Sequence, residues 1–204
     1  MRGRAGEDPG TALREHLIDA AEKLLAEKPV TTITTRDIAR TAGVSDGVLY
    51  NYFADKHDLL VAALVRRYGE LMTKYDSGLP APGTGTVEDN LKVYARASLD
   101  LVAEALPVVP GLISEPALLH RFFVAIHTEP FGPHRMRQPI ADYLAGEQRL
   151  GRVGDFDVDA AVGLVMGPAI MLGATELMSG TPRAELADEF ERIVHTMLTG
   201  LGPR

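Results

Sequence analysis

Apolar residues recur at helical spacing along most of the chain. In the segment 11–27 the apolar positions Leu13, Leu17, Ala20 and Leu24 fall on one face, which predicts an amphipathic helix. Clusters of Gly, Pro, Ser and Thr interrupt the later patterns, and the cluster over 77–86 predicts a loop. No alternating strand pattern occurs, so we predict an all-α fold with about nine helices. The later predicted helices cover residues 56–76, 87–105, 117–127 and 136–150, a helix that starts at 157 or 159 and ends at 178, and residues 183–198.

The segment 34–60 carries separate start and stop signals for three short helices. Thr34 or Thr35 can cap the first of these helices, because Asp37 follows at the spacing of a capping box. Gly43 stands where that helix ends, and glycine adopts the left-handed conformation of a helix end without a Cβ penalty.

Ser45 and Asp55 are predicted to cap the second and third of these helices. The second helix is predicted to span residues 45–53, with Leu49 and Phe53 pointing inward and holding it on the first. A tight turn that begins at Gly43 joins the first and second helices, which is the layout of a helix-turn-helix. This motif presents its second helix to the DNA major groove.

The segment 34–60 resembles the DNA-binding domain of TetR/AcrR-type repressors. Tyr52 stands at a position that is often His in that family, and Asp46 places a carboxylate near the phosphates. The resemblance implies an N-terminal three-helix helix-turn-helix head and a C-terminal helical ligand-binding and dimerisation domain. We expect a disordered arm over residues 1–10, the DNA-binding domain over 11–65 and the effector-binding and dimerisation domain over 66–204. The matching residues are Thr35, Asp37, Ile38, Ala39, Ala42, Gly43, Val44, Ser45, Gly47, Leu49, Tyr50, Tyr52, Phe53, Lys56 and Leu59.

The resemblance also implies which residues touch double-stranded DNA. Side chains at the positions of Thr35, Tyr50, Tyr52 and Lys56 contact phosphates in the family, and those in the second helix lie near base edges. Glycine inside a helix lowers stability by roughly 1 kcal/mol relative to alanine. Gly47 within the second helix therefore indicates either close approach of DNA or crowding within the protein. The predicted DNA-binding residues are Thr35, Arg36, Ser45, Asp46, Gly47, Tyr50, Asn51, Tyr52 and Lys56.

The C-terminal part is too long to serve DNA binding alone. Residues 159–178 are apolar nearly all round, which predicts a buried helix that Pro168 kinks. We expect a homodimer that binds a palindromic operator, with Gly163, Gly167, Gly173, Ile193 and Met197 at the dimer interface. A small apolar effector is expected to contact Tyr94, Leu99, Leu118, Phe122, Phe123, Ile126, His127, Met166 and Met171, because methionine and aromatic side chains suit adaptable apolar binding.

Composition bounds the class of protein. The 204 residues are 46% hydrophobic and carry a net charge of −7, while residues 1–56 hold 8 Lys and Arg against 9 Asp and Glu. The head is therefore close to neutral, and phosphate binding depends on the placement of a few groups. The chain contains no cysteine, and no metal or cofactor is expected. An N-terminus without an apolar core and no long apolar run predict a cytoplasmic protein without a membrane segment.

Other functions stay open from the sequence. Gly43-Val44-Ser45-Asp46-Gly47 fits the G-x-S-x-G pattern of a hydrolase nucleophile, but that motif needs a preceding strand, and the preceding pattern here is helical. His120, His127 and His134 recur at seven-residue intervals, yet Pro130 and Pro133 break the helix between the last two. We therefore expect no enzyme and no metal site, and we retain an effector-independent repressor or an activator as the alternative.

Overall fold

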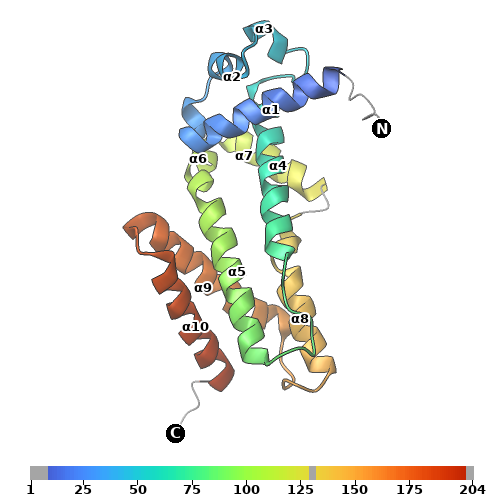
Figure 1. Cartoon of the computed structure of the whole chain (residues 1–204), viewed down its shortest axis with the longest axis vertical. Coiled ribbons are helices and arrows are strands. Elements are labelled where there is room, and N and C mark those ends of the chain that lie inside the picture. The colour runs from blue at the N-terminus through green and yellow to red at the C-terminus, as the bar shows by residue number, and fades with distance from the viewer. Residues whose placement is uncertain (1–8, 129–131, 201–204) are drawn as a thin grey trace, which may run out of the picture. The chain divides into compact units, whose positions relative to one another are not determined.

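The structure is a computed structural model that describes residues 9–128 and 132–200. These residues form α-helices and short 3-10 turns without any strand, which confirms the prediction of an all-α fold for this part of the chain (Figure 1). Residues 1–8 of the predicted arm lie outside the described ranges, and Pro9 begins the first helix. The helices are α1 (Pro9–Glu27), α2 (Thr35–Ala42), α3 (Asp46–Leu49), α4 (Lys56–Asp76), α5 (Val87–Ala105), α6 (Val109–Ile113), α7 (Pro116–Thr128), α8 (Gln138–Arg149), α9 (Val158–Ser179) and α10 (Arg183–Thr199).

The described helices belong to two compact units. The first contains residues up to Tyr68 together with Val108–Pro130, and the second contains Gly69–Pro107 and the chain from Phe131 onward. Helix α4 therefore contributes to both units, and α6 and α7 belong to the first. The functional division at residues 65 and 66 stays a prediction, whereas packing places a later segment of the chain with the head.

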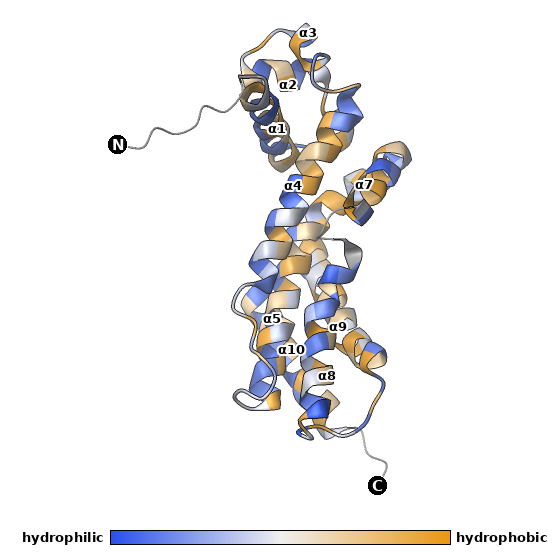
Figure 2. Cartoon of the chain, turned by 90° about the vertical axis from the view of Figure 1, so that its right-hand side faces the viewer, coloured by the Kyte–Doolittle hydropathy of each residue, from blue (hydrophilic) through white to orange (hydrophobic). Residues whose placement is uncertain are grey.

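The first unit is built on a core of leucine and isoleucine side chains. Leu17, Ile38, Leu49 and Leu60 come from α1, α2, α3 and α4, and each is fully buried. Arg66 of α4 adds ion pairs to three carboxylates that follow one another along α1, with Nη2 2.6 Å from Asp19 Oδ1, Nε 2.8 Å from Glu22 Oε1 and Nη1 3.2 Å from Glu15 Oε2. Helices α1 and α4 are thus held together by both packing and charge. Figure 2 shows hydrophobic and hydrophilic residues alternating along α4 and α7, as amphipathic helices require.

The second unit packs α5 against α9 and α10, and α8 against α9. Tyr143 and Phe190 are the largest side chains that are completely buried there. Figure 1 shows α9 and α10 side by side at the end of the chain. The loop over 77–86 is fixed by the buried carboxylate of Glu147, which accepts the backbone N–H of Gly83 at 3.1 Å.

Helix α9 differs from its prediction. Its inner face is buried through Val162, Val165, Ala169 and Leu172, but Leu164 is 58% exposed on the other side. A helix that is apolar all round is therefore only half covered within one copy of the chain. By length and composition α9 is also the one described helix that could cross a membrane, with 33% of its apolar window buried. The core helix of a soluble protein passes the same test, so this observation is weak evidence for a membrane.

Candidate nucleic-acid interface

The start of α2 is held by a complete capping box. Thr34 Oγ1 accepts the backbone N–H of Asp37 at 3.1 Å, and Asp37 Oδ2 accepts the backbone N–H of Thr34 at 3.0 Å. Lys28 Nζ and Arg40 Nη2 each donate to the same carboxylate at 2.7 Å. The hydrogen bond from Lys28, followed by those from Thr34, holds the pKa of Asp37 far below its usual range. The predicted choice between Thr34 and Thr35 is thus settled in favour of Thr34.

The turn after α2 has the geometry that the sequence predicts. Gly43 adopts a left-handed φ of 67°, and the N–H of Val44 donates to the carbonyl oxygen of Ala39 at 3.0 Å. His16 Nε2 of α1 lies 2.9 Å from the carbonyl oxygen of Ala42. The end of α2 is therefore fixed to α1, which sets the direction in which the chain enters α3.

Helix α3, the candidate recognition helix, is shorter than predicted. It spans Asp46–Leu49 and continues as a turn through Tyr52 instead of running to Phe53. Ser45 occupies the N-cap position, but its side chain makes no capping hydrogen bond. The hydroxyl of Ser45 is therefore not used by the helix. Leu49 and Phe53 are 0% and 6% exposed, which confirms that they anchor this region from inside.

The side chains around α3 present an outward surface. Tyr50 is 57% exposed, an unusual position for a large aromatic ring. An added Cβ at Gly47 would meet nothing within 4 Å, so crowding inside the protein does not explain this glycine. Of the predicted DNA-binding residues, Arg36, Ser45, Asp46, Gly47, Tyr50 and Asn51 are exposed, and Thr35, Tyr52 and Lys56 are half-buried.

Two cations of the predicted set already have partners in the protein. Lys56 Nζ donates to the carbonyl oxygen of Ile33 at 3.1 Å, so the ammonium group is partly committed to the fold. Arg36 Nε lies 3.4 Å from Asp46 Oδ2, with both side chains more than half exposed. Neither contact is predicted by residue spacing, nor is the pairing of Lys28 with Asp37, because turns separate these partners along the chain.

Serine at position 45 does not form a nucleophile elbow. It lies between α2 and α3, with no strand before it, so the strained strand-to-helix turn that exposes a hydrolase serine is not formed here. The helix-turn-helix geometry accounts for the same residues.

Comparison with known proteins identifies this head. Residues 17–63 match the model of the family described as "Bacterial regulatory proteins, tetR family". The helix-turn-helix head of the chain is therefore of the TetR type. The matched segment runs from the middle of α1 into α4 and so includes the whole helix-turn-helix.

Relatives of this chain are named as regulators of transcription. The HTH-type transcriptional regulator BetI of Rhizobium meliloti is 34% identical over 71 residues, which are 35% of each chain. The fatty acid metabolism regulator protein of Bacillus subtilis is 31% identical over 83 residues, 41% of this chain and 43% of the relative. The chain thus covers less than half of the length of these curated relatives. None of these names describes an enzyme, in agreement with the sequence prediction.

The similarity of fold to solved structures extends beyond the matched head. A protein of Mesorhizobium loti assigned to the TetR family has a TM-score of 0.78 at 19% identity, covering 95% of this chain and 98% of that one. FadR from Bacillus subtilis, solved in complex with stearoyl-CoA, has a TM-score of 0.66 at 20% identity, covering 92% of this chain and 99% of that one. At these identities the similarity shows the fold alone.

The predicted effector residues fall into two groups. Tyr94, Leu99 and Met166 are buried in the second unit, where Met171 is 52% exposed on α9. The others lie on α7 in the first unit, where Leu118 and Ile126 are buried, Phe122 is half-buried, and Phe123 and His127 are exposed. The structure therefore does not bring the nine residues together within one unit, and their role stays a prediction.

The predicted dimer residues also separate into two kinds. An added Cβ at Gly173 would lie 2.7 Å from Val102 Cγ1, so this glycine permits close packing of α9 on α5 within the chain. Gly163 and Gly167 have nothing within 4 Å of an added Cβ. They line an open hollow of about 860 Å³ on the outer side of α9 and α10, with Ile193 and Met197.

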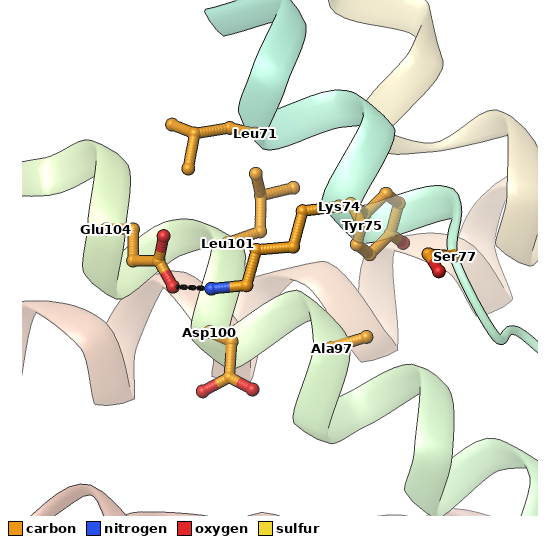
Figure 3. A pocket seen from close by; sticks show the side chains of 8 residues that line it. All are labelled: Leu71, Lys74, Tyr75, Ser77, Ala97, Asp100, Leu101 and Glu104. Carbon is orange, nitrogen blue, oxygen red and sulfur yellow. Dashed lines mark hydrogen bonds and ion pairs between the residues drawn. The ribbon is translucent and has the colours of Figure 1, made fainter. Parts of the chain in front are cut away.

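Two further hollows lie in the second unit. One of about 570 Å³ is lined mainly by apolar side chains of α5, α8, α9 and α10, including Leu91 and Leu144, with Arg152 and Asp157 as its charged members. The other, of about 170 Å³, lies between the end of α4 and α5, where Lys74 pairs with Glu104 beside Tyr75 (Figure 3). The predicted effector residues line neither of them.

Proposed function

We propose that this TetR-family protein is a homodimeric, cytoplasmic transcriptional repressor that a small apolar effector releases from a palindromic operator. In this mechanism two heads insert their α3 segments into successive major grooves of double-stranded DNA. The observation that carries the proposal is the outward surface of α3, where Tyr50 and Gly47 are exposed above the buried anchors Leu49 and Phe53.

The outward surface has the chemistry that DNA binding needs. Hydroxyl groups of Thr35, Ser45 and Tyr50 are suited to donate to phosphate oxygens or base edges, and Asn51 offers an amide with both a donor and an acceptor. Gly47 leaves the backbone open to close approach by DNA. These groups require no large positive charge, which is consistent with a head that is nearly neutral.

Dimerisation is proposed through the outer side of α9 and α10. Leu164 lines the open hollow on this side and is 58% exposed, and Met171, seven residues later on the same face of α9, is 52% exposed. Exposed apolar side chains on one helix face favour an interface. A second copy of the same face would cover them. Two-fold symmetry would then match a palindromic site with half-sites one helical turn of DNA apart, about 34–36 Å, or a multiple of that distance.

The effector is proposed to bind in the second unit. The apolar hollow of about 570 Å³ is within the size range of pockets for small organic molecules. FadR, a neighbour by fold, was solved with stearoyl-CoA, so this fold accommodates a ligand with a long apolar part in that protein. An effector lowers DNA affinity only if it binds the released state better than the DNA-bound state.

The proposal is tested by selection of DNA from a random duplex library at fixed salt, with Tyr50→Ala as the comparison. We expect an enriched palindrome with the wild-type protein and loss of that enrichment with Tyr50→Ala. A wild-type protein that enriches no sequence at any salt concentration would refute the DNA-binding function. The effector-independent alternative is separated by titrating candidate apolar compounds into the operator complex, since only a ligand-released repressor loses affinity.

A further inference from the structure

Helices α6 and α7 are structural components of the head, although they follow α5 in sequence. Leu112 of α6 and Leu118 of α7 are 5% and 0% exposed within the core that α1, α2 and α4 form. An added Cβ at Gly111 would lie 2.7 Å from Val30 Cγ1 in the turn before α2. The segment is therefore packed tightly against the part of the chain that leads into the helix-turn-helix.

Arg121 of α7 makes the most direct polar contact between this segment and the helix-turn-helix. Its Nη1 donates to both carboxylate oxygens of Asp55 at 2.9 Å and to Asp58 Oδ1 at 3.0 Å. Beside it, His57 Nε2 lies 3.5 Å from Glu115 Oε2, the residue before α7. These contacts join α7 and the residue before it to Asp55, His57 and Asp58 around the start of α4.

The carboxylates that Arg121 holds also define where α4 begins. The N–H of Asp58 donates to Asp55 Oδ1 at 2.9 Å, and the N–H of Ala54 donates to Asp58 Oδ2 at 3.3 Å. Asp55 follows Phe53, the inner anchor of the recognition region, by two residues. A shift of the Asp55 and Asp58 carboxylates would therefore shift the turn that carries Tyr50, Asn51 and Tyr52.

We propose that Arg121 is a positioning residue for DNA recognition, which sets the orientation of the recognition turn through Asp55 and Asp58. This inference rests on the proposed DNA-binding function. The segment 108–130 belongs to the first unit, and both of its ends continue along the chain into the second unit. The chain therefore connects that unit to the recognition turn through α7 as well as through α4. Arg121 itself does not contact DNA in this proposal.

The test uses the full chain and the operator found by selection. Operator affinity is measured for the wild type, Arg121→Gln, Arg121→Lys and the control Arg149→Gln, which removes the same charge from an exposed position on α8 without an ion pair among the described residues. Affinity for a scrambled duplex is measured in parallel. Each protein is first shown by circular dichroism to be folded at the assay temperature, so that reduced stability alone does not alter the affinity.

We expect Arg121→Gln to weaken operator binding at least about 5-fold, the lower end of typical coupling between sites. Binding to the scrambled duplex should change no more than it does for Arg149→Gln. Arg121→Lys, which retains the charge, should restore most of the loss. Equal operator affinities of Arg121→Gln and Arg149→Gln would overturn the inference. If Arg121→Gln is not folded, wild-type affinity of a folded Arg121→Met protein would overturn it in the same way. Absence of any operator for the wild type would instead refute the proposed function.

Discussion

Arg36 Nε lies 3.4 Å from Asp46 Oδ2, which joins α2 to the first residue of α3 on the outward face of the head. Their side chains are 87% and 55% exposed, and an ion pair this exposed contributes little to stability, ~0–1 kcal/mol. The ion pair instead affects the charge of the outward face, because Asp46 neutralises the Arg36 guanidinium, which could otherwise contact a phosphate. In the proposed DNA complex, a phosphate would therefore compete with Asp46 for Arg36.

Asp46→Asn is expected to tighten DNA binding and to increase its salt dependence. The change frees Arg36 and removes a negative charge that faces the phosphates. If Arg36 gains one phosphate contact in each head, the slope of log K against log salt should steepen by about 0.9 per contact. Titrations of operator binding at several salt concentrations measure this. Asp155→Asn removes the same charge from the exposed loop after α8, and an equal effect of that control would argue against a local role for Asp46.

Gly47→Ala separates folding from recognition. An added Cβ meets nothing in the protein, and alanine is the better helix former by about 1 kcal/mol. The free energy of unfolding should therefore stay the same or rise slightly, while operator affinity should fall because the methyl group occupies the space needed for close approach by DNA. Urea denaturation and operator titration measure the two effects. Unchanged operator affinity would remove Gly47 from the predicted DNA-binding set.

The stability of the head is expected to fall in acid through Asp37. Its pKa is lowered in the folded state by Lys28 and Thr34, so the ionised carboxylate stabilises the fold. This contribution is complete above the unfolded pKa of about 4 and is lost as the pH falls toward the lower folded value. The Asp37→Asn protein should be less stable than the wild type at neutral pH and should lose less stability than the wild type between about pH 5 and pH 3. These two pH values lie about one unit above and below the unfolded pKa. Thermal melts across this range measure it, and Asp155→Asn should leave the pH profile of the wild type unchanged.

Tyr75 predicts a second, alkaline loss of stability. Its hydroxyl is buried near Ser98 Oγ at 3.4 Å and donates to the carbonyl oxygen of Met136 at 3.2 Å. Burial raises the pKa of Tyr75 to about 12, so the neutral form is favoured by folding. The contribution is complete below the unfolded pKa of about 10 and is lost as the pH rises through the folded value.

Tyr75→Phe should therefore flatten the stability profile at high pH. The expected difference between wild type and variant across this window is on the order of 2 kcal/mol. Denaturant titrations at several alkaline pH values measure it. Tyr50→Phe makes the same substitution at an exposed position and should retain the alkaline slope of the wild type. An unchanged slope for Tyr75→Phe would contradict the assignment of this loss to Tyr75.

Leu164→Glu is expected to weaken the dimer. Leu164 is exposed beside Gly163 and Gly167 on α9, and a carboxylate brought into an apolar interface without a partner costs several kcal/mol. Sedimentation velocity should show monomers at micromolar concentration and operator binding should weaken, since two heads would no longer be joined. Val93→Glu places the same charge on an exposed apolar position of α5 and should leave the assembly unchanged. A dimeric Leu164→Glu protein would exclude this part of α9 from the interface.

Local chemistry explains why much of the head was predictable from its sequence. The capping box of Thr34, the left-handed Gly43 and the cap at Asp55 all act within four residues along the chain. The spacing of apolar residues also predicted longer helices, and α5 spans residues 87–105 as predicted. The recognition helix was overestimated because its apolar anchors Leu49 and Phe53 keep helical spacing even where the chain has passed into a turn.

The sequence by itself determined the helical class, the helix-turn-helix and the family resemblance, because these depend on spacing and on caps between near neighbours. Only the tertiary structure decided which face of each element is covered. It separated Gly173, packed against Val102, from the open Gly163 and Gly167, although all three share one apolar helix. It also joined Arg121 to Asp55 across 66 residues. Such contacts depend on how distant helices meet, and neither periodicity nor composition carries that information.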